Sequence, residues 1–180
     1  LVGYAVASLL AAALSLVMLM SGANLRAIFS FLLGGLDGAT WPRLAAAALP
    51  LIFATTLLAL RGRPLAALLL GDEGAMHLGV EVRRERRISV ALASLATAAA
   101  VALAGLIGFV GLVVPHLIRL AVGPDPRAVL PLSAIGGALL LLVADSVART
   151  IGIPVGVITA LIGAPFLLWL LHRTRAGYAL

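Results

Sequence analysis

The sequence contains no cysteine and no lysine, and only 11% of its residues are charged. Without cysteine there can be no disulfide framework, thiolate metal site or cysteine nucleophile. Without lysine there can be no Walker-type phosphate loop, because that loop uses a lysine to reach the phosphates. Soluble domains carry roughly a quarter of charged residues, whereas this chain is 63% hydrophobic with a mean hydropathy of +1.18. The composition therefore indicates a membrane protein.

All thirteen basic residues are arginines, and the formal net charge is +6. A basic balance can indicate nucleic-acid binding. Here, however, the arginines gather at the ends of apolar runs, which is typical of anchoring on the cytoplasmic side of a membrane. We therefore predict that the chain lies in a lipid bilayer and has no nucleic-acid partner.

Six apolar runs are predicted to cross the membrane as helices, because about 20 residues rising 1.5 Å each span a core about 30 Å thick. The fourth run holds four glycines and Pro115, which predicts a kinked or irregular helix buried among its neighbours. The predicted fold is all-α, a polytopic membrane helix bundle in a single domain over residues 1–180. The six runs are residues 2–20, 42–60, 88–106, 105–123, 129–149 and 154–171.

A shorter apolar segment, residues 24–36, ends at a pair of glycines. About a dozen residues are too few to cross a bilayer, so we predict a re-entrant half helix surrounded by protein or a watery cavity. We interpret it as the gate of a pathway, while a plug or an amphipathic interface helix remains the alternative. The predicted pathway residues are Ser21, Gly22, Asn24, Ile28, Phe31, Gly34 and Gly35.

Residues 61–87 hold ten of the twenty charged side chains between two apolar runs. The stretch Gly71-Asp72-Glu73-Gly74 favours the start of a short helix, because carboxylates are stabilised near a helix N-terminus. We predict a cytoplasmic loop that folds into short helices and receives a soluble partner. Taken from the residues alone, a solvated loop with well-placed helix caps is the alternative.

The distribution of arginine predicts the orientation of the chain. The side that carries the 61–87 loop and the C-terminal tail has about ten arginines and is therefore predicted to be cytoplasmic. Arg26, Arg43 and Arg149 fall on the opposite side. Arg149 either pairs with Asp145, four residues earlier on the same helix, or meets a partner outside the membrane.

Several long motifs occur in a characteristic order: GGLDGATW (34–41), LLLGDEGAMHLGV (68–80), VALAGLIGFVGLVVPHLIRLAVGPDPR (101–127), LLVADSVART (141–150) and IPVGVITALIGAPFLLWLL (153–171). Together they cover nearly the whole chain. The sequence resembles the permease subunits of ABC importers for iron siderophores, haem and cobalamin. Members of that family usually carry several more residues before the PVG motif, whereas Thr150 is here followed directly by Ile151-Gly152-Ile153-Pro154.

The resemblance implies a ten-helix subunit of which this chain forms the C-terminal six helices. It also implies a homodimer, two cytosolic ATPase subunits that hold ATP and Mg²⁺, and a periplasmic substrate-binding protein, all at the bacterial inner membrane. The chain itself would be a transport subunit and not an enzyme, and would bind no cofactor or metal. The motifs do not separate siderophore, haem and cobalamin as the cargo.

The resemblance also assigns roles to individual residues. It places Arg149 at the docking site of the binding protein, and it makes His116 part of a general motif and not a substrate ligand. It places the coupling contact with the ATPase at Leu70, Gly71, Asp72, Glu73, Gly74, Ala75, His77, Leu78 and Gly79.

The sequence also bears on two other functional classes, an ion-coupled secondary transporter and an intramembrane enzyme. In an ion-coupled secondary transporter, Asp145 would be the coupling acid and the broken helices would form the site. Its place one turn from a helix end, with Arg149 four residues on, argues against that role. An intramembrane enzyme is excluded, because the sequence has no Gly-x-Ser-x-Gly nucleophile motif, paired mid-membrane aspartates or His-Glu-x-x-His motif.

Overall fold

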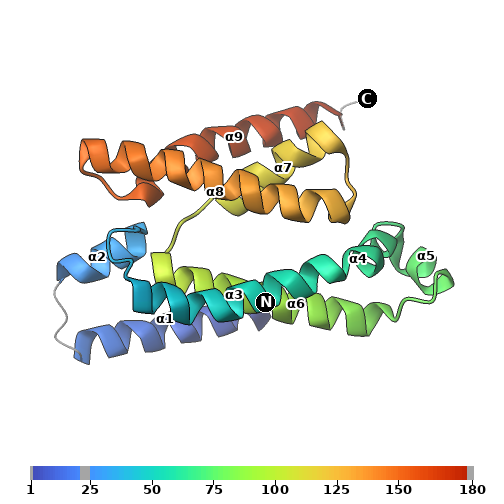
Figure 1. The fold of residues 1–180 in the computed structure, drawn as a ribbon, viewed down its shortest axis with the longest axis horizontal. Coiled ribbons are helices and arrows are strands. Elements are labelled where there is room, and N and C mark those ends of the chain that lie inside the picture. Colours follow the sequence, from blue (N-terminus) through green and yellow to red (C-terminus); the bar gives the residue numbers. More distant parts are fainter. Residues whose placement is uncertain (1, 21–24, 178–180) are drawn as a thin grey trace.

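The computed structural model describes residues 2–20 and 25–177, and all regular structure in that part of the chain is helical (Figure 1). This confirms the all-α fold. The helices are α1 (Val2–Met20), α2 (Leu25–Leu33), α3 (Trp41–Leu60), α4 (Gly62–Leu68), α5 (Gly71–His77), α6 (Val82–Ala104), α7 (Val110–Val122), α8 (Pro126–Ile151) and α9 (Val155–Gly177).

Five described helices, α1, α3, α6, α8 and α9, are long and apolar enough to cross a membrane. The fourth predicted crossing, residues 105–123, is only partly helical, because its helix α7 has 13 residues. Such a helix rises about 20 Å, which is less than the hydrocarbon thickness of about 30 Å. Gly105 and Phe109 have φ angles of +69° and +68°, so the chain leaves helical geometry between α6 and α7. The predicted irregularity includes a break before α7, and Pro115 lies inside that helix.

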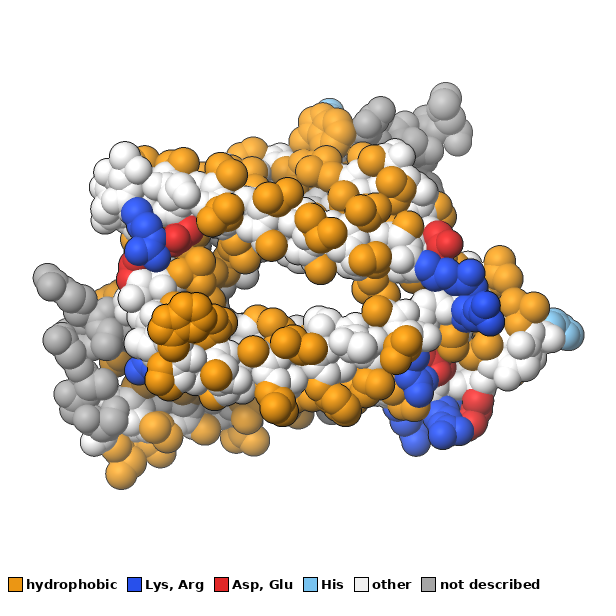
Figure 2. Space-filling model, viewed as in Figure 1, with side chains coloured by type: hydrophobic (Ala, Val, Ile, Leu, Met, Phe, Trp, Pro, Cys, Tyr) orange, Lys and Arg blue, Asp and Glu red, His pale blue; other side chains and the backbone are white. Residues whose placement is uncertain are grey.

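The described helices form two layers (Figure 1). One layer is the antiparallel pair of α3 and α6, which the short helices α4 and α5 connect at one end. The other layer packs α7 and α9 against α8. The layers touch where α3 and α4 meet α8, while α2 contacts α9 at the other end, and an opening remains between the layers (Figure 2).

The charged loop is shorter than the predicted span 61–87. Helix α6 begins at Val82, so residues 82–87 are helical and continue directly into the membrane crossing. Val82 and Glu85, one turn apart, are both buried, because they share the face of α6 that points into the protein. The arginines of this turn lie on its exposed side, where the long side chains reach water.

The connection between α8 and α9 is a tight turn of three residues. Gly152 ends α8 with a φ of +78°, and the backbone N–H groups of Gly152 and Ile153 both donate to the Ala148 carbonyl at 2.8 and 3.1 Å. A glycine in this left-handed conformation is the usual way to satisfy the last carbonyls of a helix. Ala144, Ala148 and Val155 pack beneath the turn and are almost fully buried. The turn between α8 and α9 thus satisfies the Ala148 carbonyl with two backbone donors.

On the face seen in Figure 2, the charged side chains of the described residues gather at the two ends, and the surface between them is mainly apolar. Helix α1 is exposed along nearly its whole described length, with large apolar side chains such as Leu19 and Tyr4 about 80% exposed. Such a surface suits lipid or further protein and not water.

Candidate functional site

The half helix α2 is tied to the break between α6 and α7. The N–H of Gly35 donates to the carbonyl of Ala104 at 2.9 Å, and the N–H of Leu106 donates to the carbonyl of Phe31 at 3.1 Å. These bonds use backbone groups that the end of α2 and the end of α6 would otherwise leave unpaired. The end of α2 must therefore move together with the break. Of the predicted pathway residues, Ser21, Gly22 and Asn24 lie outside the described part of the chain.

Three glycines allow the backbones of α2, the break and α9 to touch. A Cβ on Gly34, whose φ is +68°, would lie 2.7 Å from both the Leu106 carbonyl oxygen and Ile107 Cγ1. A Cβ on Gly105 would overlap the carbonyl oxygen of Phe31, and one on Gly156 would overlap that of Leu33. We call Gly34, Gly105 and Gly156 the glycine junction. Gly35 differs from them, because the nearest atom to its added Cβ is 4.0 Å away.

The side chains of α2 divide between this junction and an apolar cavity. Ile28 and Phe31, both predicted pathway residues, are half-buried. Leu32 and Leu33 are more exposed and line a cavity of about 610 Å³ together with Phe109 and residues of α9. The walls are almost wholly apolar, so the cavity offers contact without strong polar ligation. None of the predicted pathway residues that the structure describes lines this cavity, and the gate stays a prediction.

Phe109 was not singled out from the sequence. It adopts a φ of +68°, a conformation that is rare for a bulky residue. Its side chain lies directly over Gly163 of α9, where an added Cβ would overlap the Phe109 side chain. Strained backbone of this kind is held only by surrounding packing. The glycine at 163 in the sequence could have suggested a close contact, but not its partner.

At the opposite end, α4 and α5 form a compact hairpin beyond the ends of α3 and α6. Ala67, Ala75 and Val82 are its buried core. The predicted helix start at Gly71 is confirmed by α5. Eight of the nine predicted coupling residues are exposed or half-buried and Ala75 is fully buried, so Ala75 serves as scaffold.

An apolar surface stands out on this hairpin. Leu69, Leu70, Met76 and Leu78 are each 58–67% exposed. They share no buried core with the hairpin, whose small interior is filled by alanine and valine. Exposed apolar residues grouped on a rigid element mark a surface for another protein. We refer to these four residues as the coupling patch.

Two ion pairs hold the hairpin to α6. Arg61, where α3 gives way to α4, pairs with the buried carboxylate of Glu85. Arg86 pairs with Asp72 at 2.9 Å, but both of these side chains are more than half exposed. A pair between exposed groups contributes about 0–1 kcal/mol, so the Arg61–Glu85 pair is the more important link.

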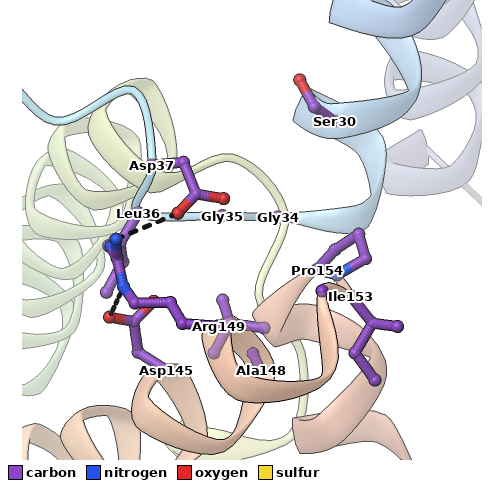
Figure 3. A pocket seen from close by; sticks show the side chains of 12 residues that line it. Ser30, Gly34, Gly35, Leu36, Asp37, Asp145, Ala148, Arg149, Ile153 and Pro154 are labelled. Carbon is purple, nitrogen blue, oxygen red and sulfur yellow. Dashed lines mark hydrogen bonds and ion pairs between the residues drawn. The ribbon is translucent and has the colours of Figure 1, made fainter.

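A pocket of about 510 Å³ with both polar and apolar walls lies where the loop after α2 meets the turn between α8 and α9 (Figure 3). Arg149 Nε donates to Asp145 Oδ2 at 2.7 Å, which confirms the pair considered from the sequence. Its Nη1 also lies 3.3 Å from Oδ1 of Asp37, which belongs to the loop between α2 and α3. The contact with Asp37 was not foreseen. It could have been suggested only by the position of Asp37 within the GGLDGATW motif.

The histidines are not gathered into a metal site. Within the described ranges, no three side chains of His, Asp or Glu lie close enough together to hold an ion. His116 on α7 packs edge-to-face on Phe166 of α9, with ring centroids 5.7 Å apart. This contact gives His116 a packing role between the two helices.

The FecCD transport family profile matches residues 1–173, nearly the whole sequence. The chain belongs to the FecCD transport family. This membership, together with the five apolar helices long enough to cross a bilayer, makes it a multi-pass membrane protein.

Similar proteins are named as permeases of several importers. The chain is 48% identical over 172 residues to the cobalamin import system permease protein BtuC of Halobacterium salinarum, covering 94% of this chain and 47% of that protein. It is 44% identical over 181 residues to the hemin transport system permease protein HmuU of Yersinia pestis, covering 97% and 54%. The Fe(3+) dicitrate transport system permease protein FecD of Escherichia coli is 42% identical over 150 residues, which cover 81% of this chain and 47% of FecD. The chain thus spans about half the length of these relatives.

A solved structure has the same arrangement of helices. It is described as an inward-facing conformation of a metal-chelate type ABC transporter and superposes with a TM-score of 0.76 at 34% identity. The match covers 83% of this chain and 49% of that one.

Proposed function

We propose that the chain is the C-terminal part of the membrane-spanning permease subunit of a binding-protein-dependent ABC importer. Its cargo would be a metal chelate or corrinoid, namely an iron siderophore, haem or cobalamin, which are compounds of the kind that the relatives' names mention. The observation that carries the proposal is the α4–α5 hairpin, because it presents an apolar patch on a packed scaffold at the arginine-rich end. We infer that this end faces the cytosol and that the membrane is the inner membrane of a bacterium.

The coupling patch is proposed to dock on a cytosolic ATPase subunit, which would supply ATP and Mg²⁺. The chain itself would then be no enzyme. Hydrolysis on another chain can act on this one only through rigid-body movement. The hairpin has a buried core and an ion pair to α6, so it can transmit that movement to α3 and α6 as a rigid unit.

The transport pathway is proposed to lie between two copies of the subunit, lined in part by α1 and α2. Helix α1 supports this proposal, because its long exposed apolar surface can contact either a second copy of the subunit or lipid. The apolar cavity beside α2 suits a large, rigid, mainly organic cargo that is passed by shape and not by tight polar ligation. No ligand needs to be coordinated on this route, and the subunit would carry no metal or cofactor of its own.

Arg149 is proposed to receive an acidic side chain of the periplasmic binding protein. It is 54% exposed at the end opposite the hairpin. Complementary charge at such a place speeds docking, sets its orientation and is weakened by salt.

The test is transport by the full-length subunit that contains this chain. The subunit would be reconstituted in liposomes with the ATPase and the binding protein encoded beside it, and uptake of ferrichrome, haemin and cyanocobalamin would be measured. We expect uptake of one of them that requires both ATP inside and the binding protein outside. Uptake driven by a proton or sodium gradient without ATP would instead establish an ion-coupled transporter.

A further inference from the structure

Arg149 is shared by two carboxylates that differ in exposure. Asp145, on the same helix, is 18% exposed and accepts a hydrogen bond from Nε at 2.7 Å. Asp37 reaches across from the loop after α2, is 77% exposed, and lies 3.3 Å from Nη1 (Figure 3). The first contact is short and sheltered and lies within one helix, so it fixes the guanidinium in place. The second is long and open to water, and a pair of that kind contributes about 0–1 kcal/mol.

The pocket is unfavourable to an incoming anion while Asp37 remains there. A guanidinium presents five N–H donors in a planar fork, which pairs best with a carboxylate in two parallel bonds. Asp145 uses Nε, and Asp37 stands beside Nη1 on the face that is open to solvent. With both aspartates in place the cluster has a net charge of −1, so a third carboxylate would meet net repulsion. A third carboxylate can bind Arg149 well only if Asp37 moves away from Nη1.

We propose that Asp37 occupies the position of the binding protein's carboxylate on Arg149, and that docking displaces it and frees the loop after α2. The inference rests on the proposed docking role of Arg149. Asp145 is then a positioning residue for Arg149, while Asp37 is the exchangeable partner. An acidic side chain on the docking protein is the ligand that this exchange requires.

The exchange would act on the loop that follows the half helix. Asp37 lies three residues after Gly34, and the backbone between them is bound to the α6–α7 break through the bond from Gly35 to Ala104. While Asp37 is paired with Arg149, the same loop is also fastened to α8. Displacement of Asp37 removes the tie between this loop and α8, whereas the glycine junction keeps the end of α2 against α9 and the break. Docking at the outer end would thereby free the loop that follows the half helix.

The direction in which Asp37→Asn changes the affinity for the binding protein distinguishes this exchange from a purely structural role of Asp37. Asp37→Asn keeps the size of the side chain but removes the competing charge. Affinity for the substrate-free binding protein should rise about two- to five-fold at low ionic strength, since a pair of up to about 1 kcal/mol corresponds to that range, and the gain should shrink in high salt. Binding would be measured on the full subunit with its ATPase in lipid nanodiscs. Amide hydrogen exchange over residues 36–39 should quicken in this variant and, in the unaltered protein, on docking.

Three further variants make the outcome unambiguous. Asp145→Ala should weaken docking although it changes the charge by the same amount as Asp37→Asn, because Arg149 loses the acceptor that fixes its orientation. Asp125→Asn, the same change of charge at the opposite end of α8, should leave docking unchanged, since asparagine also caps helices. Arg149→Glu should abolish most binding, and reversing the charge on the partner should restore part of it.

If Asp37→Asn weakens docking or leaves it unchanged while Arg149→Glu abolishes it, Asp37 is a brace or a bystander and the exchange is refuted. If Arg149→Glu also has no effect, the docking role of Arg149 itself is wrong.

Discussion

Arg61, at the junction of α3 and α4, forms an ion pair with Glu85, the buried carboxylate of α6. Arg61 precedes the hairpin and Glu85 follows it, 24 residues later in the chain. Their pair therefore joins the chain entering the hairpin to the chain leaving it. Glu85 Oε1 is buried without a hydrogen-bond partner in the structure, so Arg61 is the group that offsets the cost of burying this charge. The hairpin is thereby fixed to the membrane helices at its base.

Glu85→Ala should therefore destabilise the subunit. Removing one member of a buried pair costs about 3–5 kcal/mol. Arg61 is 32% exposed and can be rehydrated, so we expect about 1–3 kcal/mol. The measurement is thermal unfolding of the purified subunit in detergent. Arg86→Gln breaks the exposed pair with Asp72 and should cost less than about 1 kcal/mol; equal losses in both variants would contradict the distinction drawn here.

The coupling patch should be separable from folding. Leu70→Ser with Leu78→Ser should leave expression and unfolding temperature nearly unchanged, because the two side chains are 67% and 62% exposed. The same double variant should lower binding to the ATPase and uptake at least ten-fold, as loss of contact residues at an interface centre does. Association with the purified ATPase and uptake would be measured together. Replacing residues 71–74 with a Ser-Gly linker should uncouple ATP hydrolysis from transport; normal uptake by that variant would refute the coupling role.

The two adjacent glycines after α2 should respond differently to alanine. Gly34→Ala places a Cβ 2.7 Å from backbone and side-chain atoms of the α6–α7 break and requires a φ of +68°. Gly35→Ala meets nothing closer than 4.0 Å. We expect the first to cost about 1–3 kcal/mol and to block uptake, and the second to have little effect on either. The readouts are unfolding temperature and uptake. If Gly35→Ala is as harmful as Gly34→Ala, the glycine junction is not what holds the half helix.

The sequence predicted the elements well wherever the signal was local. Runs of apolar residues located α1, α3 and α8 to within three residues and the start of α9 to within one, although α9 continues to Gly177 and not to residue 171. The glycine and carboxylate pattern at 71–74 located α5. The start of α6 was predicted at residue 88 and lies at Val82. The arginines of its first turn are typical of a loop in the sequence, and only the burial of Glu85 shows which face of this turn is inside. The pairing of Asp37 with Arg149 joins residues more than a hundred positions apart. No periodicity or spacing in the sequence encodes such a contact.

The contact between Phe109 and Gly163 gives a further test, because it rests on volume alone. An alanine Cβ at position 163 would overlap the Phe109 side chain, which is held at a φ of +68° and has little freedom to move. Gly163→Ala should therefore destabilise the protein by about 1–3 kcal/mol, as overpacking does.

Trimming Phe109 should relieve that clash. Phe109→Gly alone should be destabilising, yet the double variant should be more stable than the sum of the two single effects by about 1 kcal/mol or more, because glycine at position 109 removes the side-chain atoms, Cβ included, that a Cβ at position 163 would overlap. Gly111→Ala on α7 is the matched control, since its added Cβ meets nothing within 4 Å, and it should be neutral or slightly stabilising. Unfolding temperatures of the four variants, each compared with the unaltered subunit in the same detergent, complete the cycle. Additive single effects would mean that the Phe109 side chain does not rest on α9.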